Sequence, residues 1–458
     1  MNTSLLAVLL VIGTALVAPA AAYRPDLTKP LGFRIYTNQP AGNTLENDPV
    51  RRAAKEPQLH PLETQRKIKV PPGFEVRLFA SEPEIVNPVA MTWDERGRLW
   101  VVELYEYPKG AKKGEKGRDR IKILEDTDAD GKADKVTVFA EGFSLATGLA
   151  LGNGGVYLGQ APDLLFLEDT NGDDKADKVT KLLTGFGMED RHELLNGFAW
   201  GPDGWLYMTH GVFTHSTVRD PNAHDPDGFG VQMDAALARF HPRTKKFEVF
   251  ADGTSNPWGV DWNERGDAFV SACVIQHLFH MAPGGQYNRQ GGTWANPYGY
   301  AGDLPSKGLP AIVDFRHYRA AHSGICVYQG DQWPAEWRGL VFLGNIHQNS
   351  LNCDRLTPVG STYKAEKESK LLGPSKGDHE VGAGNFLVSD DPWFRPVSCQ
   401  TGPDGAVWIA DWCDKYPCYQ NAQADPEGVD REMGRIWRVV WVGGEKGKAV
   451  ASRSKLLK

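Results

Sequence analysis

The chain has 458 residues, of which 41% are hydrophobic, and a formal net charge of −7. It therefore lacks the basic footprint that nucleic acid binding requires. Its 50 glycines, 30 prolines and 14 tryptophans indicate many turns and short aromatic-rich strands rather than long helices. The length would allow two or three ordinary domains, although one all-β domain can use as many residues. Composition favours a soluble, globular, all-β protein.

An apolar stretch lies near the start of the chain, LLAVLLVIGTALVAPAAA at residues 5–22, and it ends in an Ala-x-Ala site. We interpret residues 1–22 as a secretory signal peptide, which predicts export to the periplasm or the cell exterior. A single N-terminal membrane anchor is the alternative; no other stretch is long and apolar enough to span a bilayer. Residues 23–66 are polar and rich in proline, and we expect them to form an extension on the protein surface.

Six segments share one pattern, a tight turn that ends in glycine followed by a short strand with alternating aromatic or β-branched residues. Their turn glycines recur about every 60 residues, at positions 97, 155, 204, 266, 339 and 405. Strand–turn–strand units at a regular period are typical of propeller blades. The sequence therefore predicts an all-β, six-bladed β-propeller over residues 67–441. A β-sandwich with coincidental turns is the less favoured alternative.

Two strands at the ends of this region have no blade of their own. GFEVRLFA (residues 73–80) precedes the first repeat, and GRIWRVVW (residues 434–441) ends the sixth. Pairing both in one composite blade would close the ring without leaving a free sheet edge. Residues 442–458 are expected to form a tail or a linker.

Two acidic loops, DTDADGKADK at 126–135 and DTNGDDKADK at 169–178, lie between predicted hairpin strands. Clustered carboxylates and a glycine-permitted bend supply the hard oxygen ligands that Ca²⁺ prefers. The predicted metal ligands are Asp126, Asp128, Asp130 and Asp134 in the first loop and Asp169, Asn171 and Asp173 in the second. The twelfth position of the first loop is Thr137 rather than Glu, so it is not an EF-hand. Ordinary acidic hairpin turns are the alternative.

Polar residues stand just before the innermost strand of each predicted blade, where propeller loops surround the central channel. They are Asn87, Thr147, His192, Asn196, Asn256, His322 and Arg395. Together they would suit a polyhydroxylated or anionic ligand in one funnel; capping of blade backbone is the alternative for any single residue. His192, which is followed by Glu193, is the candidate general base. Arg395, beside Trp393 and Phe394, is suited to hold a carboxylate or an oxyanion.

Other histidines and the cysteines carry weaker signals. His277, His280 and His347 lie near strand ends, but no third ligand has a spacing diagnostic of a metal site. Cys413 and Cys418 are close enough in sequence to pair, although connectivity cannot be read from spacing. No CxxCH motif occurs in the chain, so it has no c-type haem attachment site of its own.

Several blocks of the chain carry a family resemblance in order along residues 65–441. They include VPPGFEVRLFASEPEIVNPVAMTWDERGRLWVVELYEYP, LNGFAWGPDGWLY, SACVIQHLFHMAPGGQYNRQGG and DDPWFRPVSCQTGPDGAVWIADW. These blocks resemble the membrane-bound dehydrogenase domain of Planctomycetes-type (PVC group) bacteria. That domain is distantly similar to the soluble quinoprotein glucose and sorbosone dehydrogenases, six-bladed propellers that bind pyrroloquinoline quinone (PQQ) and Ca²⁺ and oxidise sugars.

The resemblance implies roles for several funnel residues. His192 matches the histidine that takes the proton of the substrate hydroxyl, while Asn256 and Arg395 would orient the quinone. From their positions in the funnel, rather than from the resemblance, Asn196, His322 and Asn87 are predicted to complete the cofactor pocket. The family block Arg-Asn-Pro-x-Gly reads Ser255-Asn256-Pro257-Trp258-Gly259 in this chain, so its arginine is replaced.

The first functional hypothesis is an exported quinoprotein-type dehydrogenase that oxidises a sugar or polyol and passes electrons to a separate carrier, such as a c-type cytochrome. The alternative is a non-catalytic propeller that binds glycans or a protein partner through the same funnel. Hydrolase or lactonase chemistry in the funnel is a third possibility.

Overall fold

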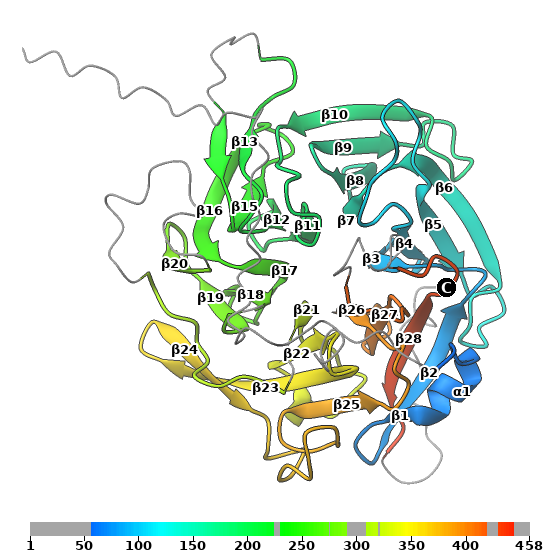
Figure 1. Cartoon of the computed structure of the whole chain (residues 1–458), viewed down its shortest axis with the longest axis vertical. Helices are drawn as coiled ribbons and strands as arrows, with labels where there is room; N and C mark the ends of the chain where they lie inside the picture. Colours follow the sequence, from blue (N-terminus) through cyan, green and yellow to red (C-terminus); the bar gives the residue numbers. More distant parts are fainter. Residues whose placement is uncertain are drawn as a thin grey trace, which may run out of the picture. The chain divides into compact units, whose positions relative to one another are not determined.

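The computed structural model describes residues 56–223, 230–273, 275–290, 308–318, 321–418 and 429–443. Within these residues six sheets surround a common axis as the blades of a β-propeller (Figure 1), which confirms the predicted all-β, six-bladed fold. The predicted signal peptide lies outside the described residues, as do residues 444–458 of the tail. None of the helices in the described ranges has the length and apolarity of a membrane span.

The first three blades have four or five strands each, named in order from the axis outward. Blade one consists of β3 (Pro88–Trp93), β4 (Leu99–Glu103), β5 (Asp119–Glu125) and β6 (Lys135–Phe143). Blade two consists of β7 (Ala146–Gly152), β8 (Gly155–Gln160), β9 (Asp163–Glu168) and β10 (Lys178–Thr184). Blade three consists of β11 (Asn196–Trp200), β12 (Leu206–His210), β15 (Ala236–Phe240), β16 (Phe247–Thr254) and the parallel strand β20 (Gln286–Arg289). Its β12–β15 connection carries the hairpin β13 (Ser216–Val218) and β14 (Val231–Met233).

The last three blades are less uniform. Blade four has three strands in the described residues, β17 (Asn256–Trp262), β18 (Ala268–Cys273) and β19 (Leu278–Met281). Blade five consists of β21 (His322–Val327), β22 (Leu340–Asn345), β23 (Ser350–Val359), β25 (Asn385–Ser389) and β1 (Ile68–Lys69), with β24 (Thr362–Lys367) also paired to β23. The β21–β22 connection includes the 3₁₀ turn η4 (Ala335–Trp337). Blade six consists of β26 (Pro396–Thr401), β27 (Val407–Asp411), β28 (Arg435–Trp441) and β2 (Phe74–Ser81).

Closure of the ring occurs in blade six, as predicted from the two end strands. β2 from the start of the propeller pairs antiparallel with β28 from its end, with Val76 opposite Val439 and Glu75 opposite Val440. Since β28 also pairs with β27, the N-terminal strand becomes the outermost strand of the last blade. The two end strands therefore supply each other with a sheet partner.

A polar side chain, as well as the glycine, stabilises the repeated turn between the first two strands of a blade. In blade three, Asp203 accepts hydrogen bonds from the backbone N–H of Trp205 (3.2 Å) and the hydroxyl of Tyr207 (2.9 Å). In blade six, Asp404 accepts from the backbone N–H of Ala406 (3.2 Å) and the indole of Trp408 (2.9 Å). Five of the six predicted turn glycines have positive φ, which favours glycine. Blade two differs, because Gly154 rather than Gly155 takes this conformation.

The innermost strands shape the axis of the propeller. Each has a register shift near its first residues, at Pro88/Ala90, Ala146/Gly148, Asn196/Ala199, Pro257/Val260, Ser323/Cys326 and Pro396/Ser398. Such bulges bend a strand and redirect its side chains. The cavity between these strands is about 40 Å³, which is room for water but not for a sugar or a quinone. A sugar or a quinone would therefore have to bind among the loops above the channel.

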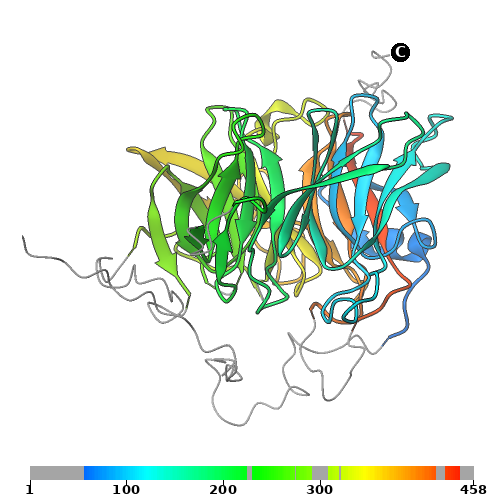
Figure 2. The same cartoon turned by 90° about the horizontal axis from the view of Figure 1, so that it is seen from above.

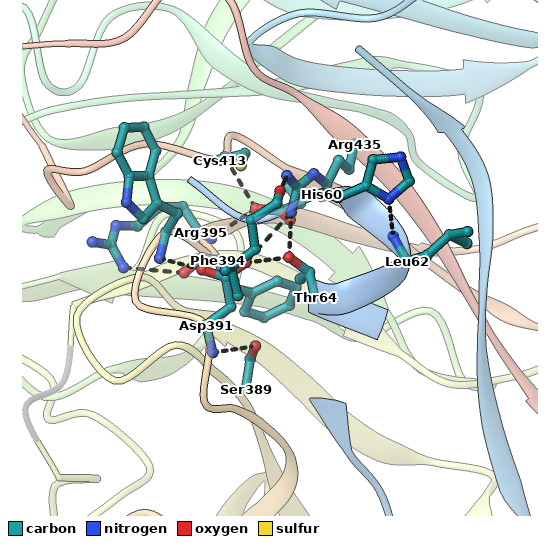
Figure 3. A network of polar contacts seen from close by, with 12 residues as sticks. His60, Leu62, Thr64, Ser389, Asp391, Phe394, Arg395, Cys413 and Arg435 are labelled. Carbon is teal, nitrogen blue, oxygen red and sulfur yellow. Dashed lines mark hydrogen bonds and ion pairs between the residues drawn. The ribbon is translucent and has the colours of Figure 1, made fainter. Parts of the chain in front are cut away.

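A short helix not expected from the sequence, α1 (Pro61–Lys67), precedes β1 and is joined to blade six by a buried polar network (Figure 3). The guanidinium of Arg435, fully buried, donates to Thr64 Oγ1 (2.6 Å) and pairs with Glu82 (3.1 Å) and Asp391 (3.4 Å). Thr64 in turn donates to Asp391. The end of the predicted N-terminal extension is therefore an ordered part of the propeller.

Candidate functional site

The loops that enter each innermost strand lie at the same face as the loops that join the second and third strands of a blade, because successive blade strands are antiparallel. We call this the funnel face; Figure 2 shows the strands running between the two faces. Four connections at this face supply the candidate site: 104–118, 185–195, 346–349 and 412–434, the last described up to residue 418 and from residue 429.

His192 lies in the connection between blades two and three, and its ring is held by one carboxylate. The ring Nδ1 is 2.6 Å from Oδ1 of Asp190, which also accepts the backbone N–H of His192 (2.9 Å). The ring of Tyr107, from blade one, meets the imidazole edge to face with the centroids 5.9 Å apart. The side chain of His192 is 35% exposed, so part of this Asp–His dyad reaches the solvent.

The thiol of Cys418 and the imidazole of His347 complete the cluster from blades six and five. Burial raises the pKa of the Cys418 thiol, but hydrogen bonds with His192 and His347 outweigh burial and lower it to about 5. Burial lowers the pKa of His192, but Tyr107, Asp190 and Cys418 outweigh it and raise this pKa well above the usual range. The arrangement therefore favours an imidazolium at His192 beside a thiolate at Cys418.

Glu193 follows His192 in the sequence, but the carboxylate that contacts the imidazole is that of Asp190. Glu193 is fully buried, accepts the backbone N–H of Phe213 (3.2 Å) and packs against Gly211, where a Cβ would lie 2.0 Å from its side chain. Burial and the charge of Asp190 raise the pKa of Glu193 well above its usual value. Glu193 is thus a neutral buried acid that supports the loop, while Asp190 orients the imidazole.

Four of the site residues are not identified as a group by the sequence. Asp190, Tyr107 and Cys418 carry no motif, and His347 is a lone histidine in the four-residue β22–β23 connection. All six cysteines lie in the described residues and none forms a disulfide, so Cys418 is not bonded to Cys413. The available sequence signal is position, since all four residues lie in loops between strands on the funnel face.

Two predicted cofactor residues, Asn87 and Arg395, lie on either side of Trp412, and each has one polar atom that forms no hydrogen bond within the described residues. Asn87 Nδ2 contacts the carbonyl of Trp412 (3.5 Å), and the N–H of Trp412 donates to the carbonyl of Arg395 (2.9 Å). Within the described part of the chain, the buried atoms Oδ1 of Asn87 and Nε of Arg395 have no hydrogen-bond partner. The ring of Trp412 meets that of Tyr107 at 5.9 Å, which links this pair of orphaned polar atoms to His192.

Three other predicted cofactor residues lie elsewhere. Asn196 is fully buried, donates to the carbonyls of Leu194 (2.7 Å) and Pro257 (3.1 Å), and accepts from Thr209 (2.6 Å). The bond to Pro257 joins blades three and four. His322 is buried, with its Nε2 3.1 Å from Asn352 Oδ1. Asn256 is half-buried at the start of β17 and accepts from the hydroxyl of Ser255 (3.2 Å).

Arg395 is held by backbone carbonyls rather than by a carboxylate. Its guanidinium donates to the carbonyls of Phe394 (3.1 Å) and Lys415 (3.2 Å), and burial lowers its pKa. Figure 3 shows Arg395 beside the Asp391–Arg435 network. Among the described residues, no carboxylate accepts a hydrogen bond from this buried guanidinium. Its position therefore favours an anionic group as a ligand.

The two acidic loops lie at the other end of the blades, between the third and fourth strands of blades one and two. Asp126, Asp128 and Asp130 place carboxylate oxygens within 4.8 Å of one another. Asp134 is turned to Thr127, from whose hydroxyl it accepts at 2.7 Å. In the second loop, Asp169, Asn171 and Asp173 accept backbone N–H groups of the loop itself. Calcium in these loops stays a prediction, and it would be remote from the funnel face.

Comparison with known proteins bears on the fold. The model of a family described as Domain of unknown function (DUF7133) matches residues 60–442, close to the predicted propeller. None of the curated proteins matches the chain. An oxidoreductase (glucose dehydrogenase) structure from Thermus thermophilus is similar with a TM-score of 0.51 and 17% identity, over 80% of this chain and 100% of that one.

Two further solved structures are similar at nearly the same level. The apo form of the soluble aldose sugar dehydrogenase from Escherichia coli has a TM-score of 0.49 and 12% identity, covering 80% of this chain and 99% of that one. The PQQ-bound aldose sugar dehydrogenase from Streptomyces coelicolor has a TM-score of 0.48 and 17% identity, covering 81% and 100%. At these identities the likeness concerns the fold alone.

Proposed function

The chain belongs to the family described as Domain of unknown function (DUF7133), and we propose that it is a dehydrogenase that oxidises a hydroxyl group of a sugar or other polyol at the funnel face. The observation that carries the proposal is the Asp190–His192 dyad, whose 2.6 Å contact orients an imidazole in an accessible loop of the propeller. The sequence resemblance to quinoprotein dehydrogenases implies a catalytic histidine at the same position.

His192 acts as the general base. Its Nδ1 faces Asp190, so Nε2 is the atom that would take the proton from the substrate hydroxyl. His192 must be neutral to accept this proton, and the charge of Cys418 and Asp190 favours its protonated form. A substrate hydroxyl that replaces the contact with Cys418 would remove part of that stabilisation.

Asn87 and Arg395 are the residues of this chain that fit a polyanionic quinone. Each has a buried polar atom without a partner among the described residues, and they flank Trp412, whose ring continues to Tyr107 and His192. Arg395 would bind a carboxylate of PQQ, and Asn87 would accept a hydrogen bond. When bound, PQQ supplies the two-electron acceptor that oxidation of an alcohol needs.

The test is reconstitution of the purified protein with PQQ and Ca²⁺, followed by dye reduction with a panel of aldoses and polyols. We expect a shift in quinone absorbance and substrate-dependent dye reduction. His192→Asn should lower kcat/KM by about 10²–10⁴-fold while the quinone spectrum is kept. The matched control is His241→Gln, since His241 lies in the β15–β16 hairpin at the opposite face. No absorbance change with excess quinone would contradict the proposal.

A second candidate function is thiol-based acyl transfer. Carboxylate, imidazole and thiol follow one another as Asp190, His192 and Cys418, the order of a nucleophilic triad, and the thiol has a pKa of about 5. Hydrolysis of chromogenic esters or lactones that is lost in Cys418→Ser would support it. If Cys418→Ser keeps dye reduction and the protein cleaves no ester, the dehydrogenase assignment stands alone.

Export, a separate electron carrier and a structural calcium ion are further parts of the proposal. The N-terminal apolar stretch supports export. A separate c-type cytochrome would suit as the carrier. The three clustered carboxylates of Asp126, Asp128 and Asp130 support calcium at the first acidic loop. Loss of thermal stability in EGTA, abolished in Asp126→Asn, is the expected result for that ion.

A further inference from the structure

Three histidines and one aspartate meet in a buried cluster between blades four and five. His277 precedes β19 of blade four, His317 lies in the connection before β21, and His322 begins β21. Asp354 comes from β23. The side chains of His277 and His317 are 1% exposed, and that of Asp354 is fully buried. Sequence spacing does not predict that these four residues lie close together, because they come from separate strands and loops.

The carboxylate of Asp354 is shared by two imidazoles. His277 Nε2 lies 2.8 Å from Oδ2, and His317 Nε2 lies 3.0 Å from Oδ1. The ring of His322 lies 4.5 Å from that of His277 and 5.4 Å from that of His317, centroid to centroid. The ligand atoms of His277, His317 and Asp354 all lie within 4.8 Å of one another. Two imidazoles and one carboxylate at this separation could converge on a single transition-metal ion.

One ring nitrogen of the cluster supports a ligand more directly. Nδ1 of His277 is buried and has no hydrogen-bond partner among the described residues, so the surrounding side chains do not satisfy this imidazole. His322 is oriented from outside the cluster, since its Nε2 contacts Asn352, whose own amide donates to Asn385 (2.8 Å). Anchoring of a ligand ring by a neighbouring polar group is a general feature of metal sites.

We propose that His277, His317 and Asp354, with His322 as the fourth candidate ligand, bind one divalent first-row transition-metal ion that joins blade four to blade five. Imidazole nitrogen with one carboxylate oxygen suits Zn²⁺, Fe²⁺ or Mn²⁺ and disfavours Ca²⁺ and Mg²⁺, which prefer oxygen ligands alone. The ligands are almost completely buried, which characterises a closed structural site rather than a catalytic one.

The experiment uses the full chain and Zn²⁺ as the probe. The protein is stripped with a chelator, loaded with Zn²⁺, passed through a desalting column and measured for bound metal. One equivalent of Zn²⁺ is expected to remain. Zn²⁺ at about a hundredfold excess over Kd should raise Tm by about 3 °C, and Co²⁺ loading should give the intense visible bands of a tetrahedral nitrogen–oxygen site.

The test variant is His317→Gln and its matched control is His280→Gln. His280 lies in the same segment as His277 but contacts Thr362 (3.1 Å) instead of the cluster. We expect His317→Gln to lose bound zinc and the Tm response, and His280→Gln to keep both. Should His317→Gln fail to fold, the stoichiometry and Co²⁺ spectrum of the unmodified chain decide. Substoichiometric metal with no Tm response, equal zinc in both variants, or binding of Ca²⁺ in preference to Zn²⁺ would overturn the proposal.

Discussion

Two histidine–aspartate arrangements in this propeller use the same side chains to opposite effect. At the funnel face, His192 has its own carboxylate at 2.6 Å and a side chain that is 35% exposed. Between blades four and five, His277 and His317 divide one carboxylate and are 1% exposed. The pKa of His192 is raised, whereas that of His317 is lowered by burial.

Burial lowers the pKa of both His192 and His317, so the acidic groups around each imidazole account for the opposite directions of the two shifts. His192 has Asp190, Tyr107 and Cys418 around one ring, which favours imidazolium. The buried cluster has one anion for three rings, and the pKa values of His317 and His322 are lowered. The first arrangement is suited to exchange a proton with a ligand, and the second is suited to hold a cation.

Removal of the carboxylate should give the largest difference in stability between the two arrangements. Asp354→Ala leaves two buried imidazoles without their partner, and we expect the free energy of unfolding to fall by about 3–5 kcal/mol. Asp190→Ala removes a partly exposed partner and should cost about 1 kcal/mol or less. Urea denaturation of both variants and the unmodified protein provides the measurement. Equal losses in the two variants would show that burial does not distinguish the sites.

The Cys418 thiol tests the ionic character of the funnel-face cluster. Because its pKa is about 5, the rate of alkylation by iodoacetamide should be nearly constant well above that pH and should fall as the pH drops through it. His192→Asn removes one hydrogen-bonding imidazole, so the midpoint should rise by about 1–3 pH units. Mass spectrometry identifies the labelled residue. An unchanged midpoint in the variant would mean that His192 does not stabilise the thiolate.

No carboxylate of the described residues forms a hydrogen bond with His210. The pKa of His210 therefore provides a comparison for the histidines of the two arrangements. His210 is fully buried, contacts Thr214 (2.7 Å), and burial lowers its pKa to about 4. Because the unfolded chain binds the proton more readily, the stability that His210 contributes is present above about pH 6.5 and is lost as pH falls toward 4. His210→Gln should reduce the slope of unfolding free energy against pH in this window by up to about 1.4 kcal/mol per unit. Parallel slopes would contradict this.

The fold could be predicted because its signals are local. Asp203 and Asp404 organise the turns of their own repeats, and glycines 97, 204 and 266 take the conformation that the turn requires. Closure by β2 and β28 follows from two strands that have no other partner. The prediction at Gly155 is wrong by one residue, since the turn of blade two is shorter and Gly154 fills the critical position.

The site could be predicted only in part, because its contacts are between blades. Position before a blade strand identifies His192, but nothing in the sequence identifies Asp190 as the carboxylate that contacts it. Cys418, from blade six, interacts with both His192 and His347, which come from other blades, and no sequence motif indicates these contacts. The buried cluster could not be predicted for the same reason. Sequence spacing indicates no third metal ligand near His277, whereas the structure brings Asp354 of the distant strand β23 to it.

The most direct test of the central claim, that the Asp190–His192 dyad is the base for alcohol oxidation, is the pH dependence of kcat/KM in the PQQ-reconstituted protein and in Asp190→Asn. His192 must be neutral to act and its pKa is raised, so activity should rise with pH along a limb whose midpoint lies above about 6.5. In Asp190→Asn the limb should move to lower pH, with a lower maximum. A limb at the same pH in both proteins would contradict the assignment.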